Sequence, residues 1–305
     1  MQIGVQSGYI FSDDNFEAGL RMIREAGFDS VDLNVDEQMD VGKLIRTGEN
    51  PFFSQDTQTV VAHYARFKAA ADALGLRFGQ MHAPFPVYAD GNDEANRALF
   101  DAFVKCMAVC ASLDCPNLIV HPIIWGGTQE EEWEKNIRFY SALIPAAKQY
   151  NVCICLENMF HGRNGHIEDA VCSDFREAAA YIDTLNDLAG TECFGFCYDV
   201  GHATLLGRDH RRSINQLGKR LKALHIHDND GRSDLHMQPY AFTRGTQYVT
   251  DWDGFLAGLR DVGFDGVLSF ETYRSVAFLP PQLKPVMLSY IADVGRYFQS
   301  VLTTA

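Results

Sequence analysis

The sequence predicts one (β/α)₈ TIM barrel, and three observations support this α/β fold class. The chain has 305 residues, which is within the usual size of a single barrel of this kind. Short β-rich runs alternate along it with longer segments of helical periodicity, as in parallel βα units. This alternation occurs eight times. We therefore interpret residues 1–305 as one barrel domain.

Each expected strand is a short run that ends at a loop, and each is followed by a helical segment whose apolar residues recur at intervals of three and four residues. The expected strands are Gln2–Ser7, Ser30–Asn34, Arg77–His82, Asn117–His121, Val152–Glu157, Phe194–Asp199, Ala223–His227 and Val267–Glu271. The expected helices are Asn15–Ala26, Thr57–Leu74, Asp93–Leu113, Glu130–Gln149, Asp174–Thr184, Arg212–Leu221, Trp252–Val262 and Pro281–Val301. Each helix can therefore lay one apolar face on the sheet.

Two of these helices end on the same signal. The sequence Glu-Ala-Gly-Phe-Asp-Ser at 25–30 is matched by Asp-Val-Gly-Phe-Asp-Gly at 261–266. Gly27 and Gly263 are then expected just past the helix ends, with each phenylalanine beginning the turn into the next strand. A helix-to-strand turn signal that is repeated in this way favours a barrel over an open sheet.

Composition excludes several classes of partner. The formal net charge is −14 and Lys and Arg do not cluster, whereas nucleic-acid backbones are held by clustered cations. No apolar segment approaches the length of a membrane span, and no basic stretch precedes an apolar one at the N-terminus. We expect a soluble cytoplasmic protein. The eight cysteines are too few for a disulfide scaffold in a chain of this length, so we expect reduced core thiols.

The residues that carry chemistry fall at the ends of the expected strands, where barrel enzymes place their reacting groups. Six successive strands end in a histidine or a carboxylate, namely His82, His121, Glu157, Asp199, His225 and Glu271. One such residue is more often a hydrogen-bonded polar group than a ligand. A cluster of buried carboxylates, however, requires a cation or a store of protons. Oxygen and nitrogen donors without thiolates suit Mn²⁺, Mg²⁺, Co²⁺ or Zn²⁺.

Four motifs at these positions resemble those of a known family. They are Leu-Glu-Asn at 156–158, Asp-Val-Gly-His at 199–202, His-Ile-His-Asp-Asn-Asp at 225–230 and Phe-Glu-Thr at 270–272. In this order, the chain is similar to the xylose-isomerase-like TIM barrel superfamily, from residue 2 to about residue 298. That superfamily contains sugar and keto-sugar isomerases and epimerases, inosose-processing enzymes and endonuclease IV.

Resemblance to the epimerase branch implies one divalent metal ion held by Glu157, Asp199, His225 and Glu271. It also implies that Glu157 and Glu271 act as the acid–base pair. This double role is chemically reasonable, because a metal held on a carbonyl and its neighbouring hydroxyl acidifies the C–H bond between them. A carboxylate on each face can then remove or return the proton, and epimerisation through an enediolate follows.

The resemblance also implies a set of substrate-binding residues. His202 is expected to contact a substrate oxygen, and Arg232 lies in a loop where related epimerases carry a substrate-binding arginine, although the local spacing differs. Endonuclease IV holds three zinc ions with nine ligands, and their counterparts here are His82, His121, Glu157, Asp199, His202, His225, Asp234, His236 and Glu271. Either additional metals bind, or the extra groups, among them His82, His121 and His236, hold substrate hydroxyls.

Two residues in the motifs leave alternatives open. His227 is two residues beyond His225 and points to the same face of the strand, so it is a rival for the metal; we prefer His225 because the His-x-x-Asp pattern begins there. Arg163 lies in a Gly-rich loop at 160–165. This loop either covers the substrate, with Arg163 facing an acidic group, or is solvated.

The leading functional hypothesis is a metal-dependent isomerase or epimerase of a sugar, a keto-sugar or a related polyol carbonyl compound. A lyase or dehydratase that acts on a keto-sugar or glycoside would use the same metal and base. A carbohydrate-binding barrel that has lost activity is the non-enzymatic alternative, and the retained pair of glutamates argues against it. The acidic charge argues against a phosphodiesterase. The expected partner is a small carbohydrate, and assembly into a homo-oligomer stays open.

Overall fold

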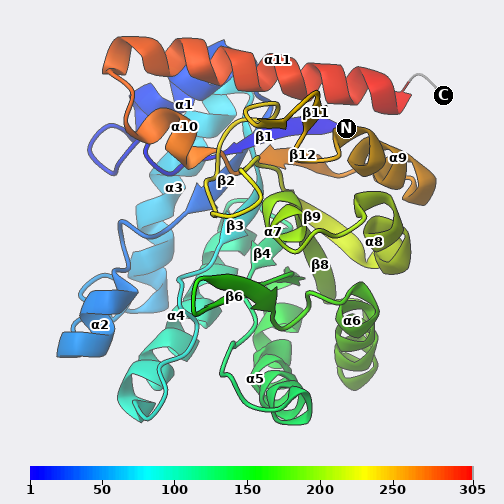
Figure 1. Ribbon diagram of the computed structural model, residues 1–305. Coiled ribbons are helices and arrows are strands. Elements are labelled where there is room, and N and C mark those ends of the chain that lie inside the picture. The colour runs from blue at the N-terminus through cyan, green and yellow to red at the C-terminus, as the bar shows by residue number, and fades with distance from the viewer. Residues whose placement is uncertain (304–305) are drawn as a thin grey trace.

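Eight parallel strands form the centre of the molecule (Figure 1). The computed structural model describes residues 1–303. In sheet order the strands are β1 (Gln2–Gln6), β2 (Ser30–Asn34), β3 (Arg77–His82), β4 (Asn117–Ile119), β5 (Cys153–Glu157), β8 (Phe194–Asp199), β9 (Leu221–His225) and β12 (Val267–Phe270). Strand β12 also pairs with β1, and a parallel bridge between Ile226 and Phe270 joins it to the end of β9. The sheet therefore closes, and the predicted barrel is confirmed.

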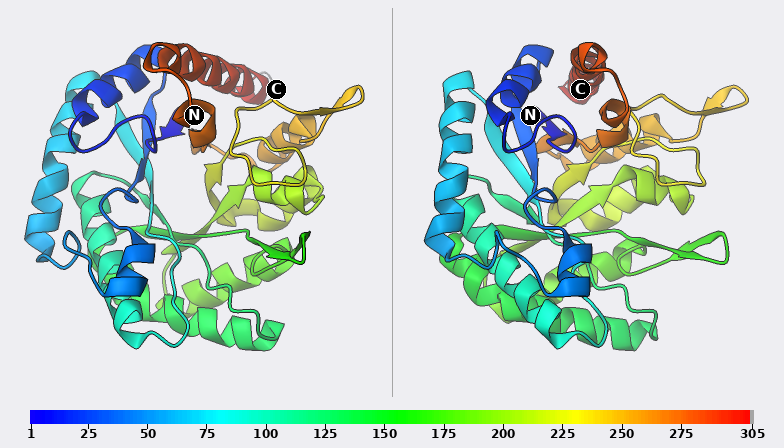
Figure 2. Two further views of the ribbon diagram at one scale, coloured as in Figure 1. Left: turned by 60° about the vertical axis from the view of Figure 1, so that its left-hand side comes forward. Right: turned by 90° about the vertical axis from the view of Figure 1, so that its left-hand side faces the viewer.

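Helices surround this sheet as an outer ring (Figure 2). They are α1 (Phe16–Ala26), α3 (Thr57–Leu74), α4 (Asp93–Ser112), α5 (Gln129–Tyr150), α6 (Phe175–Ala189), α8 (His210–Leu217), α9 (Trp252–Val262) and α11 (Lys284–Thr303). Gly27 and Gly263 follow α1 and α9 with φ of 107° and 65°, as the repeated signal predicts. At this left-handed conformation glycine lacks the steric penalty of other residues.

The strand boundaries differ from prediction by at most two residues, but three helix boundaries differ by three residues or more. Helix α6 ends at Ala189 rather than Thr184, α11 begins at Lys284 rather than Pro281, and α8 ends at Leu217 rather than Leu221. Helix α8 ends at Leu217, a 3₁₀ turn covers Gly218–Arg220, and Leu221 already begins β9. The apolar residues Leu217 and Leu221 are four positions apart, so they continue the helical period although a turn separates them. Periodicity alone therefore places this boundary too late.

Several short elements were not predicted, and most of them follow the C-terminal ends of strands. They are α2 (Val41–Thr47), α7 (Val200–Leu205), α10 (Tyr273–Ala277), a 3₁₀ turn (Pro281–Leu283) and the hairpins β6–β7 (Phe160–Arg163, His166–Asp169) and β10–β11 (Thr243–Arg244, Gln247–Tyr248). Such segments are too short to show a period of their own. They extend from the end of the barrel that carries the polar residues (Figure 2), where catalytic loops lie in this fold.

All eight cysteines are free thiols, and all but the half-buried Cys153 are buried. Inside the barrel, Cys155 and Cys197 pack with Ile119 and Ala223 in a small apolar layer. These observations agree with the expectation of core thiols. No helix within residues 1–303 has the length and apolar character needed to cross a bilayer.

A buried chain of hydrogen bonds ties β8 to the long loop between β9 and α9. The Tyr198 hydroxyl lies 2.7 Å from His210 Nδ1, and Thr204 Oγ1 lies 3.3 Å from His210 Nε2. Thr204 in turn contacts Thr250, whose hydroxyl donates to Asp228 Oδ1 at 2.7 Å. Asp228 also accepts hydrogen bonds from the backbone N–H groups of Ala241 and Phe242, and it therefore anchors this loop.

His210 in this chain gives the fold a specific dependence on pH. Burial lowers the pKa of His210 from 6.5 to about 4. Between these values the unfolded chain binds a proton that the folded protein does not, so the free energy of unfolding falls as the pH falls. Between pH 7 and pH 4.5, we expect the free energy of unfolding to decrease by about 2 kcal/mol less in His210→Gln than in the wild type. Urea denaturation at the two pH values measures this difference. An exposed control, His166→Gln, should behave like the wild type; equal losses in all three proteins would contradict the assignment.

Candidate metal-binding active site

Three carboxylates at the C-terminal ends of strands converge on one nitrogen of a histidine at the end of a fourth strand. Glu157, Asp199 and His225 are the last residues of β5, β8 and β9, and Glu271 follows β12. His225 Nδ1 lies 3.1 Å from Glu157 Oε2, 3.4 Å from Glu271 Oε2 and 4.0 Å from Asp199 Oδ2. The side chains of these four residues are at most 7% exposed. The structure thus brings together the full set that the sequence predicts as metal ligands.

The chemistry of this set fits a divalent cation. Within residues 1–303, Glu157 Oε2 and both ring nitrogens of His225 form ion-pair contacts but no hydrogen bond of good geometry, which is unusual for buried polar atoms. Three buried carboxylates also repel one another unless positive charge lies between them. Burial alone would lower the pKa of His225, but Cys197, Glu271 and Glu157 raise it well above its ordinary value. The site therefore stabilises positive charge, and Glu157, Asp199, His225 and Glu271 could hold a metal ion.

A buried carboxylate behind His225 fixes the direction of its ring. Asp32 Oδ2 lies 3.4 Å from His225 Nε2, on the side away from the three carboxylates that face Nδ1. Gln80 Nε2 donates to the same Asp32 oxygen at 2.9 Å. A histidine that binds a metal commonly gives its second ring N–H to such a carboxylate. Gln6 plays a comparable part for Glu271, because Gln6 Nε2 donates to Glu271 Oε1 at 2.6 Å. Neither Asp32 nor Gln6 was predicted from the sequence.

Replacing this carboxylate should weaken metal binding. In Asp32→Asn the side chain keeps its size but loses the charge that holds the Nε2–H of His225. We expect the affinity for Mn²⁺ or Co²⁺ to fall by about 10- to 100-fold, measured by calorimetric titration of the metal-free protein. The surface variant Asp187→Asn is the matched control and should bind metal like the wild type. An unchanged affinity in Asp32→Asn would show that Asp32 does not position the ligand.

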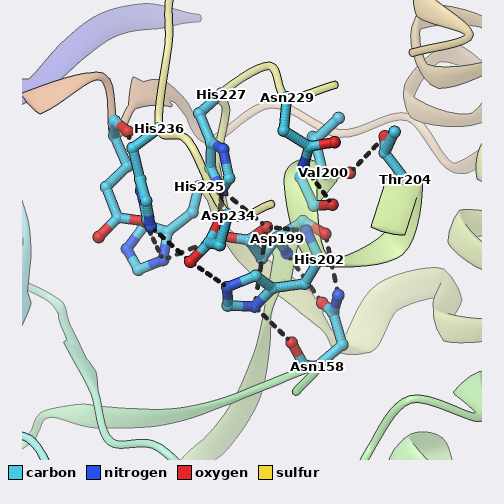
Figure 3. Close-up of polar contacts among 12 residues, drawn as sticks. Asn158, Asp199, Val200, His202, Thr204, His225, His227, Asn229, Asp234 and His236 are labelled. Atoms are coloured by element: carbon cyan, nitrogen blue, oxygen red, sulfur yellow. Dashed lines mark hydrogen bonds and ion pairs between the residues drawn. The ribbon is translucent and has the colours of Figure 1, made fainter. Parts of the chain in front are cut away.

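His227, the rival ligand, belongs to a different part of the site (Figure 3). Its Nε2 lies 3.1 Å from Asp199 Oδ1 and 3.8 Å from Asp234 Oδ1, and its ring stacks on that of His236. A side chain at Gly201 would collide with the His227 ring, which accounts for the glycine in Asp-Val-Gly-His. His225 is therefore the histidine that faces Glu157 and Glu271, whereas His227 faces the long loop after β9.

That loop completes a second cluster of ligand-type residues. His202, His227, Asp234 and His236 each offer an atom within 4.8 Å of the others, and Figure 3 shows Asp234 between His202 and His236. Asp234 Oδ2 lies 2.8 Å from His236 Nε2 and 3.5 Å from His202 Nε2. Burial lowers the pKa of His202, but Asp199 and Asp234 outweigh this effect and raise it to about 10. This cluster could hold a second cation or a polar part of a substrate.

A third group links the remaining predicted residues to Glu157. His121 Nε2 lies 3.0 Å from Glu157 Oε2 and 3.0 Å from His82 Nε2. His82 contacts the carbonyl oxygen of Ala83 through Nδ1 at 2.8 Å, so its ring is fixed from both ends. His82, His121, His202 and His236, all predicted to contact substrate, line one cleft together with Glu157 and Glu271.

The two arginines considered as substrate ligands lie elsewhere. Within residues 1–303, the cleft has a volume of about 840 Å³ and neither Lys nor Arg among its lining residues. Arg232 is exposed, and its backbone N–H donates to Asp230 Oδ1 at 2.9 Å. Arg163 is in the exposed β6–β7 hairpin with Nε 3.4 Å from Glu168. Neither arginine joins the residues that the structure brings together.

Solved structures share this architecture. A D-tagatose 3-epimerase-like protein is similar with a TM-score of 0.73 and 17% identity, over 99% of this chain and 98% of that chain. An IolI protein with a bound zinc atom has a TM-score of 0.69 and 16% identity, over 99% and 98% of the two chains. The 3-keto-D-glucoside 4-epimerase of E. coli has a TM-score of 0.66 and 17% identity, over 96% and 99%. At these identities, the similarity establishes the fold.

Two curated proteins also match in sequence. An uncharacterised protein from Methanocaldococcus jannaschii is 25% identical over 201 residues, and the match spans only 63% of each protein. An uncharacterised protein from Sinorhizobium fredii is 22% identical over 271 residues, 87% of this chain and 73% of that protein. A family model for the xylose isomerase-like TIM barrel matches residues 20–287. The motifs at the strand ends and this match agree, and the chain belongs to the xylose isomerase-like TIM barrel family.

Proposed function

We propose that this protein is a metal-dependent isomerase or epimerase of a sugar, a keto-sugar or a related polyol carbonyl compound. The observation that carries the proposal is the pair Glu157 and Glu271, which approach His225 Nδ1 from two strands that are not neighbours, β5 and β12. Two carboxylates that approach one centre from different sides can serve the two faces of a carbon atom. The similar solved structures include a D-tagatose 3-epimerase-like protein and a 3-keto-D-glucoside 4-epimerase, and their names support the same reaction class.

Glu157, Asp199, His225 and Glu271 would hold the metal. A divalent ion there would polarise a substrate carbonyl and so acidify the neighbouring C–H bond. Burial raises the pKa of both glutamates, but His225 outweighs it and keeps each pKa low, with His121 acting further on Glu157 and His236 on Glu271. Both glutamates are therefore ionised and able to accept a proton.

The proton transfers can then be assigned to named atoms. One glutamate would take the proton from carbon, and the C–H electron pair would pass into the enediolate. The other glutamate would take up a proton from water and deliver it to the opposite face, and the first would return its proton to the solvent. His121 Nε2 lies 3.0 Å from Glu157 Oε2, and His236 Nδ1 lies 3.4 Å from Glu271 Oε2. These histidines hold the carboxylates in position. Together with His82 and His202, they are the candidates to bind substrate hydroxyls.

Exchange with solvent deuterium tests this proposal. The purified protein, loaded in turn with Mn²⁺, Co²⁺, Mg²⁺ or Zn²⁺, would be incubated in D₂O with ketoses such as D-fructose and D-tagatose. We expect deuterium on the carbon next to the carbonyl and formation of an epimer or isomer, both detected by NMR. Release of water or of an aglycone would instead identify a lyase or dehydratase. No exchange with any sugar and metal would contradict the proposal.

One observation favours a second candidate, a phosphodiesterase with several metals. The structure assembles His82, His121 and Glu157 as one potential ligand group, and His202, Asp234 and His236 fall within another. Against this reading, the lining of the cleft within residues 1–303 offers no Lys or Arg to bind phosphate. Metal analysis separates the two functions. One equivalent of Mn, Co or Mg per chain supports the epimerase, and three equivalents of zinc support the phosphodiesterase.

A further inference from the structure

The cleft extends well beyond the residues that would hold the metal. Its lining continues from Glu271 into the loop after β1, the loop after β2 and the start of α2, and it reaches α3. We call this region the outer arm and define it by Phe11, Asp13, Asp36, Glu37, Gln38, Met39, Asp40 and Tyr64. Figure 2 shows α2 projecting beside the open end of the barrel. The cleft has a volume of about 840 Å³, which is near the upper end of the usual range for ligand pockets, about 300–1,000 Å³. This volume is larger than one hexose requires.

The outer arm is a preformed structure. Glu37 Oε2 accepts a hydrogen bond from the backbone N–H of Asp13 at 3.0 Å, which joins the loops after β1 and β2. Gln38 Nε2 donates to Asp13 Oδ1 at 2.9 Å, and His63 Nε2 of α3 lies 3.1 Å from the same oxygen. Three separate segments are thus tied together at Asp13. A site that needs no ordering on binding loses less free energy when the ligand enters.

Its chemistry favours an uncharged, hydroxyl-rich ligand. Asp36 and Glu37 are exposed carboxylates, and neither has an ion-pair partner within residues 1–303. No lysine or arginine is among the described lining residues, and Arg66, which lies 3.7 Å from Asp13, is already paired with that carboxylate. A phosphate or carboxylate group would therefore meet mainly like charge. Hydroxyl groups, in contrast, can donate to these carboxylates. Phe11 and Met39 offer apolar surface beside them, suited to the C–H faces of a sugar ring.

One buried group in the outer arm still lacks a partner. Tyr64 lines the cleft, its side chain is fully buried, and its hydroxyl has no hydrogen-bond partner among the described residues. Buried hydroxyl groups are normally paired. Burial and the neighbouring acidic groups raise the pKa of Tyr64 well above its ordinary value, so the hydroxyl keeps its proton. An orphaned donor at this depth is the second indication that a polar ligand belongs here.

We infer that the substrate is an uncharged disaccharide or glycoside rather than a monosaccharide or a sugar phosphate. The reacting ring lies beside Glu157 and Glu271, which rests on the proposed function, and the second ring lies in the outer arm. There its hydroxyls donate to Asp36 and Glu37, and its C–H face contacts Phe11.

Binding of four glucosyl-fructose isomers tests the inference. The protein loaded with Mn²⁺ would be titrated calorimetrically with turanose, maltulose, leucrose and isomaltulose, which differ only in linkage, and with D-fructose, D-fructose 6-phosphate and D-glucosamine. We expect at least one disaccharide to bind about 10-fold or more tightly than D-fructose, since a hydrogen bond to a charged group is stronger than one between neutral groups. D-Fructose 6-phosphate should bind most weakly. If none of the four exceeds D-fructose, or if D-glucosamine exceeds them all, the inference is overturned.

Variants locate the effect in the outer arm. Glu37→Gln and Tyr64→Phe should each weaken binding of the preferred disaccharide about 10-fold and leave D-fructose binding unchanged. The control Asp265→Asn, an exposed residue before β12 at the opposite end of the barrel, should alter neither. Equal weakening of both ligands would overturn the assignment. Deuterium exchange in the same samples tests the proposed function separately. If D-fructose exchanges but no disaccharide is preferred, only the disaccharide inference is contradicted. If a disaccharide binds but no sugar exchanges deuterium, only the proposed epimerase function is contradicted.

Discussion

Glu157→Gln and Glu271→Gln should each reduce the rate of solvent-deuterium exchange by about 10²- to 10⁴-fold, the usual contribution of a positioned acid or base. An amide is nearly the same size as the carboxylate and keeps one oxygen that can coordinate a metal, but it cannot accept the proton from carbon. Both carboxylates contact His225 Nδ1, at 3.1 and 3.4 Å. The two variants should therefore have effects of similar size on the rate at which the epimer forms, because epimerisation requires both removal and return of a proton.

Metal content must be measured beside the rate, because both glutamates are also candidate ligands. The exchange rate is therefore compared at saturating Mn²⁺, with the bound metal determined in the same samples. Glu168→Gln, on the exposed β6–β7 hairpin, serves as the matched control and should retain the wild-type rate. Full turnover in either active-site variant, with metal bound, would eliminate the two-carboxylate mechanism.

The residues that line the metal site were predictable because each one ends an apolar strand. Glu157, Asp199 and His225 are the last residues of their strands, and Glu271 lies one residue beyond. In parallel strands that surround one barrel, such residues meet at one end. Asp32 was missed because it lies inside β2, where alternation places side chains on two faces and the sequence does not say which face is inward. Only the closed barrel shows that it faces His225.

The positions of the loops along the chain were predictable, but whether their side chains face the cleft or the solvent was not. Arg232 was expected near the substrate by resemblance to related epimerases. Asp230, however, accepts hydrogen bonds from the backbone N–H groups of Arg232 and Ser233 and holds a local turn that leaves Arg232 exposed. The outer arm was not predicted at all. Apart from Tyr64 in α3, the residues that define it come from loops without periodicity, and its shape depends on contacts between segments far apart in the sequence, such as Asp13 with Glu37.

His225→Gln and His227→Gln should separate the two rival ligands. His225 Nδ1 faces three carboxylates, and its other nitrogen is fixed by Asp32. Removing this imidazole should lower the affinity for the most tightly bound metal ion by at least about 100-fold. The loss of a residue that only supports a ligand commonly lowers metal affinity by about 10- to 100-fold. His227 contacts Asp199 and Asp234 but is not in contact with Glu157 or Glu271 among the described ion pairs. Replacement of His227 should leave the affinity for the most tightly bound metal ion unchanged.

Calorimetric titration of the metal-free proteins with Mn²⁺ measures this difference. The midpoint temperature of thermal unfolding of each variant shows whether the barrel stays folded without the buried imidazole. Loss of the tightest equivalent in His227→Gln, with retention in His225→Gln, would reverse the assignment. If His227→Gln instead removes only a weaker equivalent, that ion lies in the cluster of His202, Asp234 and His236. The same titration then also decides between a metal and substrate hydroxyls for the second cluster, because hydroxyl-binding histidines would leave only one equivalent in the wild type.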